Sequence, residues 1–157
     1  MKYFLWNLLL AFVWASVSGN IAPETLAAGF LIGFGILYFV QPALGPSSYF
    51  KKVRQVVFFF FFFLWELFLA NLRVAYDVVT PTHHNKPGVI GIELDAETDW
   101  EITLLANFIS LTPGTLSLDV SDDRKVLYIH AMFVDDPETL RKEIKNGLER
   151  RLLEVLR

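Results

Sequence analysis

Two long stretches of the sequence contain no charged side chain. They run from Tyr3 to Pro23 and from Thr25 to Phe50, and only Glu24 separates them. A helix needs roughly 20 mostly apolar residues to cross the hydrocarbon core of a bilayer, so each stretch is long enough to do so. The sequence therefore predicts an integral membrane protein.

The sequence of residues 1–80 predicts a membrane region with three helices, at about 3–17, 25–41 and 53–79. Ser18-Gly19-Asn20 interrupts the first two, Pro23 suits the first turn of the second, and Pro42 marks its end. Within the second helix, Gly29 and Gly33 lie four residues apart. Such a pair of small residues lets another helix approach closely in lipid, although glycine is also common in membrane helices in general.

The third predicted helix differs from the other two because polar residues interrupt it. Six consecutive phenylalanines, Phe58 to Phe63, precede Glu66, Asn71, Arg73 and Asp77. The uncharged run is about ten residues long, which is too short to cross a bilayer. The helix either spans the membrane and pairs Glu66 with a neighbouring subunit, or lies in the membrane interface. In both cases Glu66 is expected to meet a polar partner or the headgroup layer.

The remaining chain predicts a linker at 81–87 and a small soluble α+β domain at 88–157. The expected element order is βαββα. Thr98 and Glu101 have the spacing of a helix capping box, and Asp136-Pro137 starts the last helix. The alternating sequence 115–120 is typical of a half-buried strand, with its leucines inside. Acidic residues outnumber basic ones in this domain, which argues against a nucleic-acid partner.

The soluble domain shows no motif for catalysis or for a cofactor. The absence of cysteine excludes thiolate chemistry and disulfides. His83-His84 lies in the predicted linker without further ligand residues at suitable spacing. His130 lies in a predicted strand, and a histidine in such a place more often has a structural role than acts as a catalytic base. No catalytic, cofactor-binding or metal-binding residue is therefore predicted.

The end of the first domain helix is more unusual. Asn107, Ser110 and Thr112 place polar groups on an otherwise apolar helix end, just before Pro113-Gly114. These side chains either tie down backbone groups at the junction or form a corner at which a partner docks.

Basic residues near the membrane indicate the orientation of the chain. Lys51, Lys52 and Arg54 follow the second helix, while the Gly19–Glu24 loop has no Lys or Arg. The positive-inside rule places the basic cluster in the cytoplasm. An interfacial third helix then keeps the soluble domain cytoplasmic as well.

Several motifs resemble the E subunit of the Mrp/Mnh multisubunit Na+/H+ antiporters of bacterial and archaeal cytoplasmic membranes. They are Trp65-Glu66-Leu67 with Ala70-Asn71, Lys86-Pro87-Gly88, Asp99-Trp100, the run from Ala106 to Thr115, Val120-Ser121-Asp122-Asp123 and Tyr128-Ile129-His130-Ala131. The resemblance covers nearly the whole chain in order. The N-terminal helices match mainly in hydrophobicity and length.

This resemblance implies an accessory subunit, needed for assembly or activity, in a complex that exchanges sodium for protons. The ion pathways of such complexes are attributed to their large subunits, which agrees with the lack of charged residues in the first two helices. The implied partners are the other antiporter subunits and the lipid bilayer. Candidate contact or structural residues are Gly29, Gly33, Glu66, Asn71, Asn107, Thr112, Pro113 and Gly114.

Two other functions remain open at this point. A membrane-tethered enzyme would need an acid–base pair, for which His130 with Asp119 or Asp122 is the available choice. A homo-oligomeric channel would need a polar stripe in one of the first two helices, where Asn7 and Ser16 are the available residues.

Overall fold

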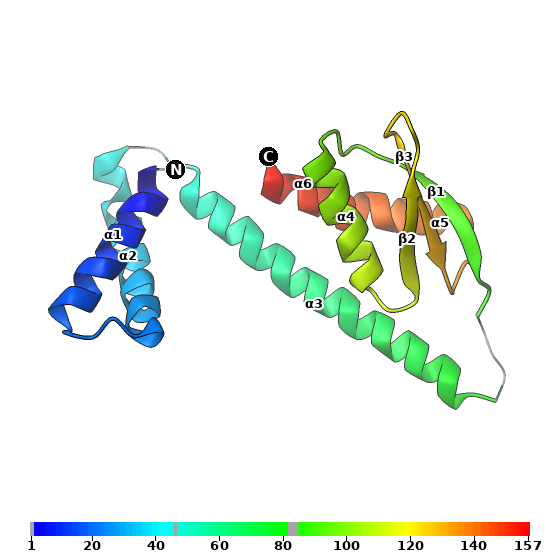
Figure 1. Ribbon diagram of the computed structural model, residues 1–157, viewed down its shortest axis with the longest axis horizontal. Helices are drawn as coiled ribbons and strands as arrows, with labels where there is room; N and C mark the ends of the chain where they lie inside the picture. The colour runs from blue at the N-terminus through cyan, green and yellow to red at the C-terminus, as the bar shows by residue number, and fades with distance from the viewer. Residues whose placement is uncertain (1, 46, 82–84) are drawn as a thin grey trace. The chain divides into compact units, whose positions relative to one another are not determined.

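The computed structural model describes residues 2–45, 47–81 and 85–157, so His83 and His84 of the linker lie outside the described residues. The chain forms two compact units, Met1–Arg54 and Gln55–Arg157 (Figure 1). The boundary between them falls near the start of the third helix, whereas the sequence suggested a boundary after it. Most of the third helix therefore belongs with the α+β domain.

The first unit is a hairpin of α1 (Lys2–Val17) and α2 (Pro23–Leu44), followed by the start of α3 (Tyr49–Val79). By length and composition α2 and α3 could each cross a membrane, and α1 is a shorter apolar helix. The helix α2 continues for two residues past Pro42, where the sequence placed its end. A proline so near a helix end removes only one of the last hydrogen bonds, so the helix can pass it.

Small residues bring α1 and α2 into close contact. A Cβ atom placed on Gly29 would lie 3.0 Å from both the Cα and the carbonyl oxygen of Ala11. One turn further, a Cβ on Gly33 would lie 3.0 Å from the Cβ of Leu10. The glycine pair therefore faces a helix of the same chain, and backbone contact of this kind is how helices associate in lipid.

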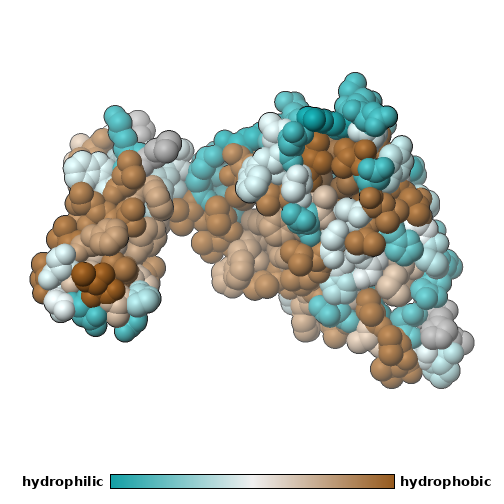
Figure 2. Space-filling model, in the orientation of Figure 1, coloured by the Kyte–Doolittle hydropathy of each residue, from teal (hydrophilic) through white to brown (hydrophobic). Residues whose placement is uncertain are grey.

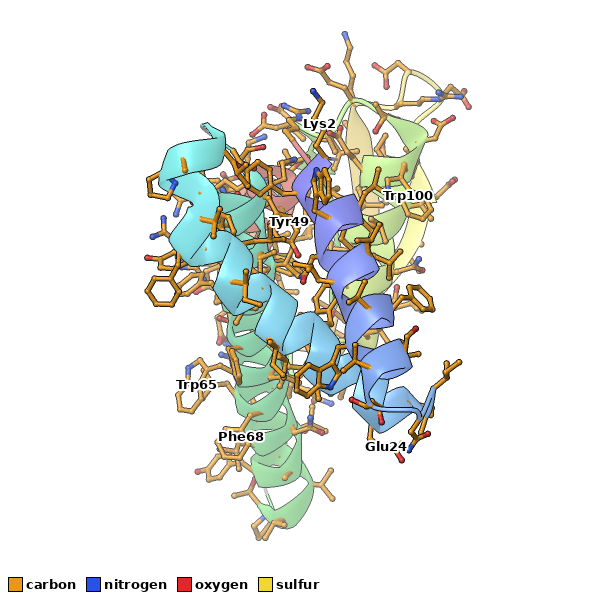
Figure 3. The ribbon with its side chains drawn as sticks, turned by 90° about the vertical axis from the view of Figure 1, so that its left-hand side faces the viewer. Lys2, Glu24, Tyr49, Trp65, Phe68 and Trp100 are labelled. Atoms are coloured by element: carbon orange, nitrogen blue, oxygen red, sulfur yellow. The ribbon has the colours of Figure 1, made fainter. Side chains whose placement is uncertain are left out.

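Charged and polar groups mark the two ends of the hairpin. Lys2 lies at one end and Glu24 at the other (Figure 3), and the surface between the ends is hydrophobic in the view of Figure 2. The hydroxyl of Tyr3 donates to the carbonyl oxygen of Gly45 at 2.7 Å. The end of α2 and the start of α3 thus lie beside the N-terminal end of α1.

The second unit contains a three-stranded antiparallel sheet. Its strands are β1 (Gly88–Glu93), β2 (Thr115–Val120) and β3 (Val126–Ala131), in the order β1-β3-β2. Its inner face carries Ile90, Ile92, Leu127 and Ile129, which form one core with Leu105 and Ile109 of α4 (Asp99–Leu111), with Leu152 of α6 (Arg150–Leu156), and with Phe59 of α3. The α+β domain with a βαββα order is confirmed.

The domain helices begin where the sequence predicts. Thr98 and Glu101 form both hydrogen bonds of a capping box. Asp136 accepts from the backbone N–H groups of Glu138 and Thr139, ahead of Pro137 in the first turn of α5 (Pro137–Glu143).

The last helix contains a π-helical turn that no local sequence pattern indicates. This turn, η1 (Ile144–Glu149), joins α5 to α6. In an α-helix, each step of four residues rotates the side chain ~40° about the helix axis. Such a rotation would turn part of one row of side chains away from the core. The row is Leu140, Ile144, Leu148 and Leu152. The wider π turn counters this rotation, and all four side chains pack on the core.

The strand β2 turns toward the domain the opposite face from the one that the sequence predicts to be buried. Leu116 and Leu118 are exposed, whereas Ser117 faces the domain. The hydroxyl of Ser117 donates to the carbonyl oxygen of Ala106 at 3.0 Å, and its N–H donates to the hydroxyl of Ser110. A bulge between Ser117 and Asp119 then shifts the register against β3. These bonds to α4 fix the inward face, so the expectation of buried leucines is wrong.

Candidate subunit-contact site

A cavity of about 540 Å³ lies between α3 and the α+β domain. One wall is the inner side of α3 from Phe62 to Arg73. The opposite walls come from the end of α4, the Thr112–Gly114 corner, the end of β3 and the last helix. Four of the candidate residues from the sequence line this space, which we name the α3 cavity: Glu66, Thr112, Pro113 and Gly114.

Aromatic contacts hold α3 on the domain beside this cavity. The ring of Phe108 on α4 meets Phe59 and Phe63 edge-on, at centroid distances of 5.1 Å and 4.7 Å. From the last helix, the guanidinium of Arg151 lies 3.8 Å from the ring centroid of Phe62. Edge-on rings and a cation over an aromatic face are both favourable arrangements. Phe59, Phe62 and Phe63 of the phenylalanine run thus help to attach α3 to the domain.

Charged side chains surround the apolar lining of the α3 cavity. Glu66 and Arg73 come from α3, and Lys142, Glu143 and Arg151 come from the last helix. The apolar lining includes Phe63, Ile109, Phe133 and Ile144. A pocket with an apolar floor and a few charged groups can bury an apolar side chain and orient its polar neighbours.

The corner at Thr112–Gly114 is fixed by its own hydrogen bonds. The Thr112 hydroxyl donates to the carbonyl oxygen of Phe108, and the Thr115 hydroxyl donates to that of Ile109 at 2.6 Å. Gly114 has a φ of +86°, a conformation that favours glycine, and its carbonyl oxygen accepts from the N–H of Met132. The corner therefore presents a rigid wall to the cavity.

The remaining candidate residues lie elsewhere. The side chain of Asn71 is exposed and donates to the carbonyl oxygen of Leu67 one turn earlier. Asn107 is exposed on α4, and at this helix end the side chains of Ser110 and Thr112 bind backbone groups. Gly29 and Gly33 belong to the hairpin unit.

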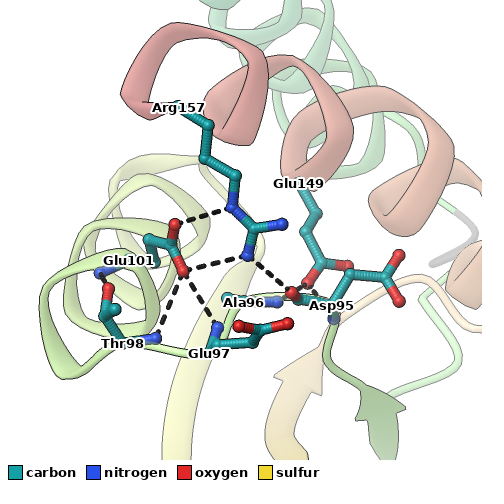
Figure 4. Close-up of polar contacts among 7 residues, drawn as sticks. All are labelled: Asp95, Ala96, Glu97, Thr98, Glu101, Glu149 and Arg157. Carbon is teal, nitrogen blue, oxygen red and sulfur yellow. Dashed lines mark hydrogen bonds and ion pairs between the residues drawn. The ribbon is translucent and has the colours of Figure 1, made fainter.

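Sequence reasoning missed a buried polar network at the other end of the domain (Figure 4). Glu149 is 1% exposed, and its Oε1 accepts from the N–H groups of Asp95 at 2.6 Å and Ala96 at 3.0 Å. Burial raises the pKa of this carboxyl. Only the capping box was visible in the sequence, because Glu149 lies more than fifty residues from its partners.

The same network contains a second carboxylate, Glu101, whose pKa is lowered. The Arg157 guanidinium and the N–H groups of Glu97 and Thr98 lower the pKa of Glu101 to about 2. Arg157 Nε donates to Glu101 Oε1 at 2.9 Å, which ties the end of α6 to the start of α4. These contacts support the fold, and neither carboxylate lines the α3 cavity.

The alternative acid–base pair is not assembled. The sheet register places Asp119 opposite Tyr128, while His130 pairs with Leu116 and Val89. Asp122 lies in the turn beyond β2. In the part of the chain that the structure describes, no group of three or more His, Asp or Glu side chains could hold a metal ion.

Comparison with known proteins decides the family. A family model described as a Na+/H+ ion antiporter subunit matches residues 7–155. The chain belongs to the E-subunit family of Na+/H+ antiporters. It is 36% identical over 151 residues to the E subunit of Alkalihalophilus pseudofirmus, covering 96% of each chain. It is 37% identical over 153 residues to that of Bacillus subtilis, covering 98% of this chain and 97% of the relative.

Solved structures show the same fold in two membrane complexes. A chain in the Mrp complex from Dietzia sp. DQ12-45-1b has a TM-score of 0.51 and 26% identity, covering 65% of this chain and 96% of that chain. A chain in an archaeal membrane-bound sulfane sulfur reductase has a TM-score of 0.60 and 27% identity, with 98% of both chains covered. The resemblance to the E subunits is confirmed, and with it the place of this chain among the subunits of a membrane antiporter.

Proposed function

We propose that this chain is an accessory subunit of a multisubunit sodium–proton antiporter, which supports assembly, carries no ion pathway and catalyses no reaction. A path for ions through lipid needs ionisable or polar side chains along its length. The sequence of α1 and α2 has one acidic residue, Glu24, and one basic residue, Lys2, at opposite ends. Among the described residues of the hairpin, Asn7 is the buried polar side chain. One amide does not make a pathway.

The structural neighbours support a role that is independent of the transported ion. One belongs to an Mrp complex and the other to a complex described as a sulfane sulfur reductase. A subunit that fits two complexes with different overall reactions is better explained by a structural role than by sodium binding.

We assign a contact site here because Glu66 and the Thr112–Gly114 corner line the same cavity. These residues are about fifty positions apart in the chain, yet they line one cavity. We expect a neighbouring antiporter subunit to place an apolar side chain in the α3 cavity, with a cationic or hydrogen-bonding group near Glu66. Such filled pockets supply most of the binding energy of an interface.

Filling the cavity tests this contact. Ala70 lines the α3 cavity, so Ala70→Trp should occupy it and exclude the partner. We expect the amount of this subunit that co-purifies with the complex to fall about tenfold, which corresponds to a loss of about 1.4 kcal/mol. Antiport activity should fall in proportion to subunit content. Ala75→Trp is the matched control, because Ala75 is exposed on the same helix and does not line the cavity.

The outcomes separate the two parts of the proposal. Normal co-purification of the Ala70→Trp variant would show that no partner occupies the cavity. Full subunit content with reduced sodium–proton exchange would contradict the accessory role, because the subunit would then act in transport itself.

We also place the α+β domain in the cytoplasm. The contacts of Tyr3 with Gly45 and of Asn7 with Tyr49 bring both ends of the hairpin to the same side. Lys2 lies at this end and Glu24 at the other (Figure 3), and Lys51, Lys52 and Arg54 follow Tyr49 in the first turns of α3. The positive-inside rule assigns the basic end to the cytoplasm.

The absence of cysteine allows a direct test of this orientation. Intact cells carrying Asn20→Cys or Asp122→Cys are treated with a membrane-impermeant maleimide. Both positions are exposed, so labelling reports the side of the membrane. We expect Asn20→Cys to react and Asp122→Cys to react only after the membrane is opened. Labelling of Asp122→Cys in intact cells would place the domain outside.

A further inference from the structure

An apolar stripe runs along the side of α3 that the domain leaves uncovered. It contains Phe61, Leu64, Trp65, Phe68, Leu72 and Val79, which are between 43% and 82% exposed. Their spacing of three, four and seven residues places them on one helix face. Figure 3 shows Trp65 and Phe68 extending from the same side of α3, and Figure 2 shows hydrophobic surface along this helix. We name these six residues the outer stripe.

The three charged residues in the second half of α3 lie on the opposite face. Glu66 and Arg73 line the α3 cavity, and Asp77 is buried. Phe59 and Phe63 on the same inner face pack against Phe108 of the domain. The helix is therefore divided lengthwise into an inner face that meets the α+β domain and an outer face that is apolar.

This division is incompatible with a helix surrounded by lipid. The inner face holds Arg151 over the ring of Phe62 and has Lys142 and Glu143 close by. A crossing helix would carry these charges into the hydrocarbon core, at a cost of roughly 2.5–3.5 kcal/mol each. The helix also has 31 residues, or ~46 Å at 1.5 Å per residue, against a hydrocarbon thickness of ~30 Å.

We propose that α3 lies parallel to the membrane surface, with the outer stripe in the boundary between headgroups and acyl chains and the α+β domain on its aqueous side. Three observations favour lipid over a protein partner for this face. Four residues separate its start from the end of α2, a helix that can span, so its start is held at the bilayer surface. Lys51, Lys52 and Arg54 occupy its first turns, where they meet anionic headgroups. The stripe also contains a tryptophan, which is enriched at membrane interfaces.

The depth of labels along α3 distinguishes a flat helix from a spanning one. In the cysteine-free chain, Phe61→Cys, Phe68→Cys and Val79→Cys each carry an environment-sensitive fluorophore, and the full chain is reconstituted in phosphatidylglycerol-containing vesicles. Quenchers are lipids with a nitroxide near the headgroup or deep in the acyl chain, and iodide on both sides of the membrane. Glu66→Cys and Arg73→Cys provide matched labels on the inner face.

For a flat helix we expect the three outer labels to be quenched equally by the shallow lipid, and the two inner labels mainly by iodide. Positions 61 and 79 lie ~27 Å apart along the axis. A spanning helix would therefore bury the label at 68 most deeply and place 61 and 79 near opposite surfaces. That profile, or iodide quenching of all outer labels, would overturn the proposal.

A protein partner on this face is tested in the assembled complex. Labelled Phe68→Cys is incorporated into an antiporter whose other subunits have no reactive cysteine. Persistent quenching by the shallow lipid supports the proposal. Loss of lipid quenching on assembly means that another subunit covers the outer stripe and overturns it.

Discussion

Replacing Glu149 with leucine should destabilise the α+β domain by roughly 2–6 kcal/mol, at about 1–3 kcal/mol for each buried donor left without a partner. Glu149 Oε1 accepts from the N–H groups of Asp95 and Ala96, which join β1 to α4. A leucine side chain accepts no hydrogen bond, and water cannot replace the carboxylate at a site this buried. Thermal unfolding of the full chain in detergent, followed by circular dichroism, measures the loss.

Two variants control for the change of side chain. Glu149→Gln keeps an acceptor oxygen for both N–H groups, so we expect it to retain most of the stability. Glu154→Leu makes the same change on the exposed side of α6, where the pair with Arg150 is 4.0 Å apart, and should alter stability by less than about 0.5 kcal/mol. Equal stability of Glu149→Leu and Glu154→Leu would mean that the buried carboxylate does not hold the two N–H groups.

The Gly29→Leu variant should separate α1 from α2. A Cβ at this position would meet the Cβ of Trp14 at 2.9 Å and backbone atoms of Ala11 at 3.0 Å. Backbone cannot rotate away as a side-chain end can, so the two helices must move apart. Overpacking of this kind costs typically 1–3 kcal/mol.

Labelling of a buried cysteine measures the separation. Ala15 is buried in the hairpin near the end of α1, and Ala15→Cys should react slowly with a small maleimide. Adding Gly29→Leu should raise the reaction rate at least about fivefold, the factor that corresponds to 1 kcal/mol. Gly35→Leu is the matched control, because a Cβ placed on Gly35 would have no atom of another described segment within 4 Å. Equal rates in the two leucine variants would contradict a close approach at Gly29.

Local patterns in the sequence were sufficient for much of the fold. Uncharged length identified α1 and α2, and capping residues identified the starts of α4 and α5. These signals are short-range, because each depends on residues within one or two turns of the same helix. The family resemblance likewise depended on local motifs, and the matched family model bears it out.

Signals that depend on long-range contacts were missed or misread. The alternating pattern of β2 suggested buried leucines, but hydrogen bonds of Ser117 to α4 turned them outward. The π turn in the last helix had no sequence signal, because it accommodates a core formed by distant strands. Glu149 resembled an ordinary helix-surface residue until its partners at Asp95 and Ala96 were placed beside it.

The sequence by itself determined that the chain has an apolar helical hairpin with Lys2 and Glu24 as its charges, a third helix with apolar and charged parts, and an acidic α+β domain. It showed Glu66 as a carboxylate beside a phenylalanine run and left its surroundings open. Only the tertiary structure brought Glu66 to a cavity with Thr112–Gly114 and turned Glu66 and Arg73 toward the domain. The physical reason is that helix periodicity fixes which residues share a face, whereas the choice of what covers that face depends on contacts between segments distant in the chain.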